Sequence, residues 1–409
     1  MIKKLLYFSF GFLCFTQVEA QVDSLDVKIG QMILVGVRSS QIDTAVLDEI
    51  RAGKIGSIIY FENNIPKSAS AFTAIKKMSW TYQKAAPIPL FISIDEEGGR
   101  VNRLKEKYGF TRTISAANAG KSKTLDSVRF YSEATASTLA GLGINVNFAP
   151  SVDLASNPTN PIIAKLGRSF SAKEDSVTLL AREVVKQHRR FGVVTSLKHF
   201  PGHGSSQADT HLGLTDVTNT WEPRELKPFQ SLIDSGYVDA IMSAHIVNKK
   251  IDRKGLPGTL SKSVIDSLLR KKMRYQGVIF SDAMEMKAIA ANYGLEEAIK
   301  LAINAGIDIL CFAHNAQGME EHTGDGVHAL IKKFVASGEI PKARIDESFR
   351  RIMKLKKNLG TSQLEKLKYE NQKLMQLVNQ RTVELKKANE EIEKLTPKKK
   401  KAKKKKVKS

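Results

Sequence analysis

The chain of 409 residues contains only two cysteines, Cys14 and Cys311, which excludes a small fold held together by disulfides. No pair of cysteines or closely spaced histidines indicates a zinc site. The apolar runs are also short, because none reaches the roughly 20 residues that a membrane-spanning helix needs. An apolar content of 42% still suffices for a sizeable core, so the chain is expected to fold through hydrophobic burial.

Acidic residues are also few, with 42 Asp and Glu against 64 Lys and Arg and a formal net charge of +22. The excess is unevenly spread, because residues after 360 hold 16 basic and 6 acidic side chains and therefore carry +10 of it. The body of the protein is only moderately basic. The sequence therefore predicts no specific nucleic-acid partner.

The N-terminus has the pattern of an export signal. Lys3 and Lys4 precede an apolar stretch at 5–15, and the run ends in Val18-Glu19-Ala20, which fits a cleavage site. We expect residues 1–20 to be a signal peptide and the protein to be secreted or periplasmic. Cleavage would leave Cys311 as the only cysteine, and its apolar surroundings predict a buried, inert thiol.

Eight short apolar runs, rich in Ile, Val and Phe, recur along the chain and look apolar on both faces. Parallel strands covered by helices on both sides have this pattern. Helix-like segments lie between them, and Gly143, Gly192 and Gly236 follow three of these segments, where helix C-caps are expected. The runs are 32–36, 55–61, 90–95, 144–150, 193–200, 240–245, 277–282 and 308–312.

Eight such units over about 330 residues predict an α/β fold, a (β/α)8 TIM-type barrel at 21–360. A doubly wound open sheet is the alternative. In a barrel the active groups lie at the carboxyl ends of the strands. Charged or titratable side chains do lie at or just after the ends of five of the runs: Asp95, Asp153, Lys198 with His199, His245 and Asp282.

The chain changes character after residue 360. Leu364, Leu367, Asn371, Leu374, Val378, Arg381, Leu385, Ala388, Ile392 and Leu395 fall on the a and d positions of four heptads. They predict a coiled-coil helix at 361–396 and a possible homodimer, although a lone charged helix is the alternative. Residues 397–409 begin with a proline and hold nine lysines. This basic, disordered tail could attract an anionic polymer or a membrane surface.

The segment KHFPGHGSSQADTHLGL at 198–214 concentrates lysine, histidine and aspartate around three glycines and a proline. Pro201 and Gly202 prevent His199 and His203 from forming the helical pair of a zincin, and we expect neither a metal nor a cofactor. Asp209 and His211 are two residues apart. The carboxylate can hold one ring nitrogen while the other nitrogen exchanges protons with a substrate.

Five motifs together resemble glycoside hydrolase family 3, in its single-barrel β-N-acetylglucosaminidase branch. They are DEEGGRVNR (95–103), GRSF (167–170), KHFPGHG with the following D-x-H (198–211), MSAH (242–245) and FSDAMEM (280–286). Any one of them is weak evidence, but together and in family order they are specific. The resemblance covers roughly residues 28–360.

The resemblance implies that Asp282 is the catalytic nucleophile and that His211 with Asp209 is the general acid/base pair. It also implies that Asp95, Arg103, Arg168, Lys198 and His199 bind the non-reducing sugar. Fixed Arg and Lys donors suit sugar hydroxyls and an acetamido carbonyl. Ion pairing within the barrel mouth is the alternative role for both arginines. We expect structural roles for Glu96 and Glu97, and a loop-organising role for His203.

These expectations describe a secreted, retaining exo-β-N-acetylglucosaminidase that removes terminal GlcNAc from peptidoglycan fragments or chitin oligosaccharides through a glycosyl-aspartate intermediate. The partner would be an amino-sugar glycan. An imidazole acid places no negative charge in the pocket, so a phosphorylase that uses phosphate in place of water is one alternative. The others are a β-glucosidase of the same fold and a non-catalytic protein that binds the cell wall.

Overall fold

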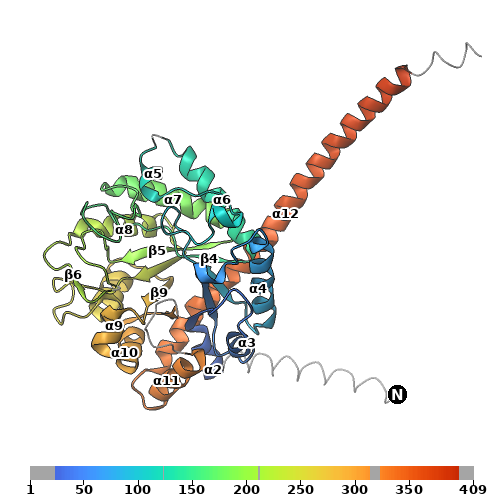
Figure 1. Ribbon diagram of the computed structural model, residues 1–409. Helices are drawn as coiled ribbons and strands as arrows, with labels where there is room; N and C mark the ends of the chain where they lie inside the picture. The colour runs from blue at the N-terminus through green and yellow to red at the C-terminus, as the bar shows by residue number, and fades with distance from the viewer. Residues whose placement is uncertain (1–23, 123, 211, 314–322, 396–409) are drawn as a thin grey trace, which may run out of the picture. The chain divides into compact units, whose positions relative to one another are not determined.

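The computed structural model describes residues 24–122, 124–210, 212–313 and 323–395. Eight parallel strands close into a barrel in the spatial order β1-β10-β9-β7-β5-β4-β3-β2, with β1 hydrogen-bonded to both β10 and β2 (Figure 1). All eight predicted runs are barrel strands, so the expected (β/α)8 barrel is confirmed and the open sheet is excluded. The strands are β1 Ile33–Gly36, β2 Ser57–Tyr60, β3 Phe91–Ile94, β4 Val146–Asn147, β5 Val194–Phe200, β7 Ala240–Ser243, β9 Val278–Ala283 and β10 Ile309–Phe312.

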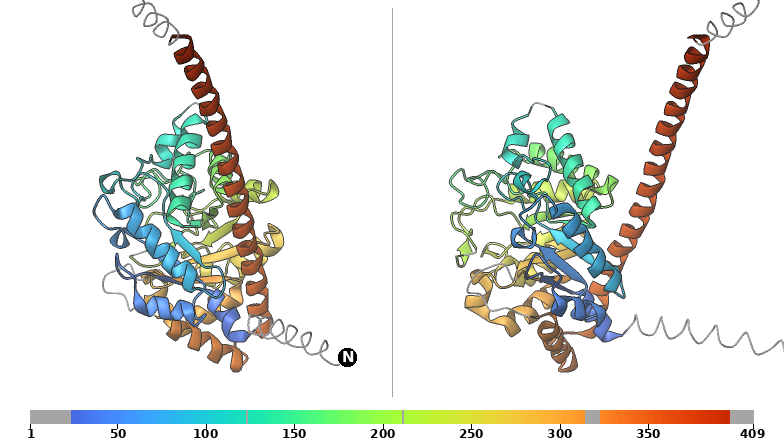
Figure 2. Two further views of the ribbon diagram at one scale, coloured as in Figure 1. Left: turned by 90° about the vertical axis from the view of Figure 1, so that its right-hand side faces the viewer. Right: turned by 45° about the vertical axis from the view of Figure 1, so that its right-hand side comes forward.

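Helices return the chain between successive strands and surround the barrel (Figures 1 and 2). The α-helices are α2 Leu25–Gln31, α3 Thr44–Arg51, α4 Ala71–Ala85, α5 Ala116–Gly120, α6 Asp126–Leu142, α7 Glu174–Arg190, α8 Lys227–Asp234, α9 Lys287–Tyr293, α10 Leu295–Ala305, α11 Gly324–Ala336 and α12 Lys342–Leu395. The shorter turns are η1 Glu62–Asn64, η2 Glu106–Tyr108, η3 Pro223–Leu226 and η4 Gly258–Leu260, and η5 Ser263–Lys272 is a π-helix.

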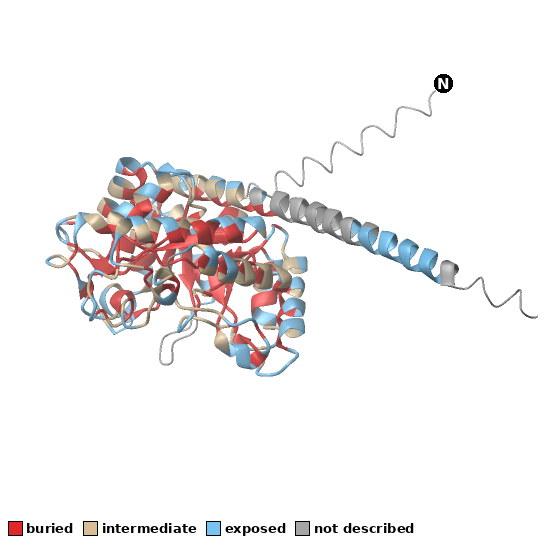
Figure 3. Ribbon diagram, turned by 90° about the horizontal axis from the view of Figure 1, so that it is seen from above, coloured by how far each residue is buried: buried red, intermediate tan, exposed pale blue. Residues whose placement is uncertain are grey.

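Helix α7 illustrates how the sequence sets these elements. Glu174 and Asp175 lie in its first turn and three basic residues lie in its last, which matches the helix dipole at both ends. Val177, Leu180 and Val184 recur at helical spacing and are buried. The helix therefore turns one apolar stripe toward the barrel, as the burial colours in Figure 3 show for the helices around it.

The interior of the barrel is a packed core rather than a channel. The ring of Phe280 lies edge-on to Phe91 at 6.3 Å and to Phe148 at 5.1 Å, measured between ring centroids. Such aromatic pairs contribute roughly 0.5–1.5 kcal/mol each beyond the area that they bury. Strands β3, β4 and β9 are thus joined across the barrel axis as well as along its wall.

A short second sheet organises the segment that follows β5. Residues Thr215–Asp216 (β6) pair in parallel with Ile246–Val247 (β8), which follows β7. Trp221 Nε1 donates to the carbonyl oxygen of Pro201 at 3.1 Å and joins the two ends of the segment. The loop that begins at Pro201 is therefore tied back to the carboxyl end of β7. Nothing in the apolar pattern predicted this sheet.

The chain divides into two compact units, Met1–Leu359 and Gly360–Ser409. Helix α12 is continuous from Lys342 to Leu395. The helix predicted at 361–396 is therefore the continuation of a helix that starts at Lys342, and it does not begin at Gly360. The boundaries expected for the signal peptide and the basic tail lie outside the described residues. No helix in the described part of the chain has both the length and the apolar character needed to cross a membrane.

Lys356 of α12 is buried beneath the barrel. Its ammonium nitrogen donates to Gln31 Oε1 at 2.6 Å and to the carbonyl oxygen of Gly56 at 2.9 Å, and it lies 4.7 Å from the centroid of the Phe91 ring. Burial without a carboxylate partner lowers the pKa of Lys356 to about 7. Two N–H donors, which the neutral amine retains, satisfy both acceptors.

Replacing Lys356 by methionine should change how stability depends on pH. Between about pH 7 and 10.5 the unfolded chain binds a proton at Lys356 that the folded chain does not, so the free energy of unfolding rises with pH in this window. Lys356→Met should remove that rise, by up to about 1.4 kcal/mol per pH unit. Urea unfolding at pH 7.5 and 9.5 gives the change in the free energy of unfolding with pH for each protein. An equal change in the wild type and in Lys356→Met would contradict the lowered pKa of Lys356.

Candidate functional site

The polar side chains that follow the barrel strands meet at the carboxyl end of the barrel. Asp95 directly follows β3, Lys198 and His199 lie within β5, and Asp282 lies within β9. The thiol of Cys311 on β10 is buried, as predicted. Its pKa is raised by burial and by the nearby negative charges of Glu285, Asp282 and Asp95. Asp282 precedes Ala283, which is opposite Cys311 on the neighbouring strand.

Lys198 is the centre of an ion-pair network. Its ammonium nitrogen lies 2.6 Å from Asp95 Oδ1 and 2.7 Å from Glu97 Oε1, and the residue is only 2% exposed. Arg103 approaches the other oxygen of Asp95, with Nη2 3.6 Å from Oδ2. The peptide bond between Lys198 and His199 is cis. The network places cations on both oxygens of Asp95 at the strand ends.

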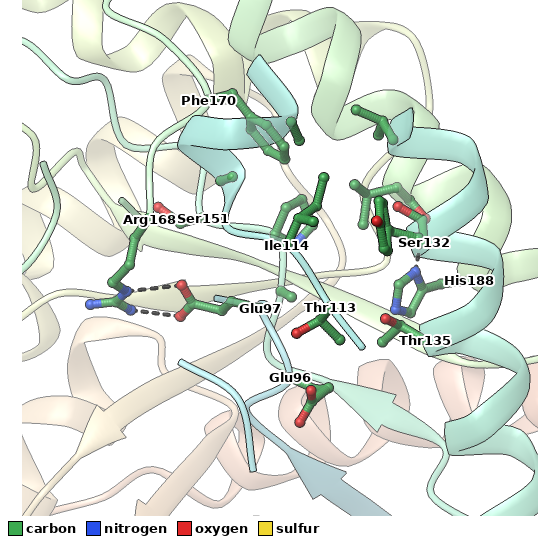
Figure 4. A pocket seen from close by; sticks show the side chains of 18 residues that line it. Glu96, Glu97, Thr113, Ile114, Ser132, Thr135, Ser151, Arg168, Phe170 and His188 are labelled. Atoms are coloured by element: carbon green, nitrogen blue, oxygen red, sulfur yellow. Dashed lines mark hydrogen bonds and ion pairs between the residues drawn. The ribbon is translucent and has the colours of Figure 1, made fainter. Parts of the chain in front are cut away.

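Glu97 and Arg168 form a two-point ion pair in which Arg168 Nε donates to Oε2 at 2.8 Å and Nη2 donates to Oε1 at 2.7 Å (Figure 4). Burial alone would raise the pKa of Glu97. The charges of Arg168 and Lys198 outweigh burial and hold that pKa well below its usual range. The same carboxylate raises the pKa of the buried Arg168 despite desolvation. Glu97 is therefore ionised, and it holds two of the predicted binding residues together.

His199 is oriented from both sides. Arg168 Nη2 lies 3.0 Å from His199 Nε2, and His199 Nδ1 lies 2.6 Å from Asp153 Oδ2. Since a guanidinium can only donate, Nε2 accepts and the ring proton resides on Nδ1, which donates to Asp153. Burial raises the pKa of Asp153, but its interactions with His199 and His203 lower it to about 2. Asp153 is a positioning residue that holds the ring and the start of the loop.

His203 has the organising role that the sequence suggested. Its backbone N–H donates to Asp153 Oδ1 at 2.7 Å, and its Nδ1 lies 2.6 Å from Ser206 Oγ. Burial lowers the pKa of His203 to about 4, so the ring is neutral near neutral pH. A buried, neutral ring tied to its own loop is not available as a second acid.

Glu96 anchors the segment that carries Arg103. One carboxylate oxygen, Oε2, accepts from the backbone N–H groups of Arg103 at 2.9 Å and Leu104 at 3.1 Å, and Asn147 holds the Glu96 backbone. The other oxygen is buried and has no partner among the described residues, and Glu96 is one of the residues that line a cavity together with Glu97 and Arg168 (Figure 4). Burial raises the pKa of Glu96, and the two backbone donors lower it by a smaller amount. The net result is a pKa of about 7. The structural role expected for Glu96 is observed.

Asp282 lies beside a buried histidine. The backbone N–H of Ala283 donates to Asp282 Oδ1 at 2.8 Å, and His245 Nε2 lies 2.9 Å from the carbonyl oxygen of Ala283. His245 Nδ1 contacts Thr259 Oγ1 at 2.8 Å. The MSAH motif therefore holds the backbone that carries Asp282, and His245 is a second positioning residue.

The predicted proton-transfer pair is described only in part. Asp209 is half-buried on the loop after β5, and its carbonyl oxygen accepts from the backbone N–H of Leu212 at 3.0 Å. His211 lies outside the described residues. No cluster of three or more His, Cys, Asp or Glu side chains suited to a metal ion occurs within the described ranges.

The structure thus groups Asp95, Arg103, Arg168, Lys198 and His199 into one network, as expected for a shared site. Both arginines are ion-paired, which is the alternative role considered for them. Glu97 was expected to have a structural role, and Asp153 was noted only because it follows an apolar run. The only sequence signals were the position of Glu97 within the segment Asp95–Gly99 and the position of Asp153 after β4. Neither signal reveals that Glu97 meets Arg168 or that Asp153 meets His199.

The family model for the glycosyl hydrolase family 3 N-terminal domain matches residues 24–355. The chain belongs to this family. Beta-hexosaminidase A of Pseudoalteromonas piscicida is 33% identical over 326 residues, which cover 75% of the present chain and 54% of that protein. A beta-hexosaminidase of Tolumonas auensis is 31% identical over 289 residues, covering 70% and 84% respectively.

A solved structure gives the same relationship for the family 3 barrel. The glycoside hydrolase family 3 beta-N-acetylglucosaminidase from Paenibacillus sp. str. FPU-7 has a TM-score of 0.75 and 34% identity, and the match covers 82% of this chain and 63% of that one. The chain thus spans little more than half the length of the Pseudoalteromonas protein and under two thirds of the Paenibacillus structure. The predicted family is confirmed over the barrel.

Removing Arg168 should destabilise the protein because it leaves the buried carboxylate of Glu97 with Lys198 as its only close cation. We expect Arg168→Met to lower the free energy of unfolding by about 3 kcal/mol. Arg253→Met is the control, since Arg253 is exposed and its loss should change stability by less than about 0.5 kcal/mol. Urea unfolding measures both changes.

The double variant Glu97→Leu with Arg168→Met removes the stranded charge together with its partner. It should be more stable than Arg168→Met alone if ion pairing holds the site together. The pair would contribute little if Arg168→Met were as stable as the wild type. The same would follow if the loss of stability in the double variant equalled the sum of the losses in Glu97→Leu and Arg168→Met.

Proposed function

We propose that this family 3 protein is a retaining exo-β-N-acetylhexosaminidase that removes terminal GlcNAc from peptidoglycan fragments or chitin oligosaccharides. The observation that carries the proposal is the network of Lys198, Asp95, Glu97, Arg168 and His199 at the same end of the barrel as Asp282. Its fixed donors and acceptors suit the hydroxyls of one terminal sugar. The relatives are named as beta-hexosaminidases and a beta-N-acetylglucosaminidase, which supports the same activity.

In the proposed first step, a carboxylate oxygen of Asp282 attacks the anomeric carbon. The bond from that carbon to the leaving oxygen breaks, and His211 gives its proton to this oxygen. A glycosyl ester of Asp282 results. In the second step His211 takes a proton from water, the water oxygen attacks the same carbon, and Asp282 leaves as a carboxylate. Asp209 would hold the His211 ring in both steps.

The binding network would serve this chemistry by holding the sugar and not by exchanging protons. Lys198 and Arg103 contact opposite oxygens of Asp95, so they hold that carboxylate in place as an acceptor for sugar hydroxyls. His199 Nε2 already accepts from Arg168, so His199 would act by holding the Arg168 guanidinium in place beside the sugar. A rigid set of partners of this kind lowers the entropy lost when the sugar and the nucleophile are brought together.

Replacing Asp282 tests the proposed nucleophile. Asp282→Asn is close to isosteric but cannot form the ester, so kcat on an aryl β-N-acetylglucosaminide should fall by about a thousandfold or more. A panel of nitrophenyl sugars separates the hexosaminidase from a β-glucosidase, and binding to cell-wall polymer without hydrolysis would favour the non-catalytic alternative. Full activity of Asp282→Asn would contradict the mechanism.

His211→Ala is the companion variant because it removes the proton donor and leaves the nucleophile. The loss in the first chemical step should be small for aryl groups that leave easily and larger for natural disaccharides, whose leaving oxygen needs a proton. Equal losses in that step across leaving groups would exclude a proton-donor role. Product analysis with and without phosphate distinguishes hydrolysis from phosphorolysis.

We further propose that the protein is exported through residues 1–20 and that the second unit supplies partner contacts. Val378, Leu385 and Ile392 recur every seven residues along α12 and are each more than half exposed in the single chain. A second copy pairing through these positions would bury them as a two-stranded coiled coil. The Lys-rich tail would add attraction for anionic polymers or membrane surfaces.

Leu385→Glu should weaken this self-association because it places a charge at the centre of the proposed seam. Val383→Glu is the matched control, since Val383 is also more than half exposed but lies off the heptad positions. Sedimentation equilibrium over a range of concentrations should give a dimer for the wild type and Val383→Glu, and a shift to monomer for Leu385→Glu. A monomeric wild type would refute the dimer.

A further inference from the structure

A basic hollow lies at the opposite end of the barrel from Asp95 and Lys198. It lies between η5, the turn that leads from α10 into β10, and the first turns of α12. The hollow holds about 1150 Å³ of empty space, counted with its opening to solvent. Its cationic side chains are Lys262, Arg270, Lys271, Arg274, Arg344 and Arg351. We call it the basal hollow.

Carboxylates compensate only half of this charge. Asp266 and Glu347 line the hollow, and Asp308 lies beneath its floor. Six cations therefore face three anions, and each anion is already engaged. Asp308 contacts three arginines, Glu347 contacts two of the same three, and Asp266 contacts Lys271 at 2.8 Å. The surplus positive charge is open to an anion from outside.

The surplus is concentrated at the lip of the basal hollow. Lys262 and Arg274 are exposed, and neither forms an ion pair with any residue in the described ranges. Arg274 has φ of 60°, the only positive φ at a residue other than glycine in that part of the chain. A glycine would adopt this conformation without the clash of a Cβ atom. Arg274 therefore places a long cationic side chain at a position whose backbone favours glycine. Residues held in such unfavourable conformations cluster at functional sites.

The floor offers donors as well as charge. Arg351 uses two of its five N–H groups in bonds to Asp308 and Glu347. Arg270 is 7% exposed, and its Nε is buried without a partner among the described residues. Asp308 holds both guanidinium groups in place, so their remaining donors are fixed before any ligand arrives. Fixed guanidinium groups suit the tetrahedral oxygens of phosphate.

We propose that the basal hollow is a binding site for a phosphate-bearing oligoanion, such as a strand of linked phosphates. Several cations spread over one hollow match several linked anionic groups better than a single carboxylate. The site is at the amino-terminal ends of β9 and β10, so its ligand would not compete with a sugar at the carboxyl end. The proposal is independent of the proposed hydrolase activity.

Charge reversal at the lip tests the proposal in the full chain. Titration calorimetry with inorganic tripolyphosphate at low ionic strength should give saturable binding to the wild type. Lys262→Glu with Arg274→Glu should raise Kd by about tenfold or more, because the two unpaired cations are removed. Both positions are exposed and outside the Asp308 cluster, so the variant should fold. Circular dichroism and an unchanged melting temperature without ligand check this.

Lys76→Glu with Lys77→Glu is the matched control. It makes the same change in net charge at two exposed lysines of α4, and every protein keeps the Lys-rich tail. The control should change Kd by less than about twofold. Equal Kd values for the lip variant and the wild type, equal losses in both variants, or citrate binding as tightly as tripolyphosphate would each overturn the proposal.

Discussion

The buried carboxylate of Glu97 is the group on which the rest of the site depends. It is surrounded by Arg168 and Lys198, and an ionised carboxylate can be buried only when such partners compensate its lost hydration. Lys198 then reaches Asp95, and Arg168 reaches His199. One buried negative charge thus links the ends of β3 and β5 with the segment that carries Arg168, and a change at Glu97 should affect all three.

The barrel explains why such a charge can be held so tightly. Its interior is filled by aromatic rings, and Phe280 contacts both Phe91 and Phe148 across the axis. The strand ends that carry Asp95 and Lys198 are therefore attached to a rigid base. Loops that rise from this base can vary in shape while the binding groups stay fixed.

The two ends of the barrel use ion pairs for different purposes. At the carboxyl end the charges nearly balance around Glu97 and Asp95, which leaves fixed donors and acceptors for a neutral sugar. At the amino end Asp308 gathers three arginines and leaves positive charge in excess. A balanced network suits an uncharged ligand, and an excess suits an anion.

The sequence by itself determined the barrel, because buried parallel strands must be apolar on both faces and the eight runs have that pattern. It also indicated Asp95, Lys198 and Asp282, since polar side chains at the ends of such runs stand out. The tertiary structure alone decided the roles of Glu97 and Asp153. A carboxylate in a loop has no sequence signal for the cation or ring that it will meet, and only folding brings Arg168 to Glu97 and His199 to Asp153.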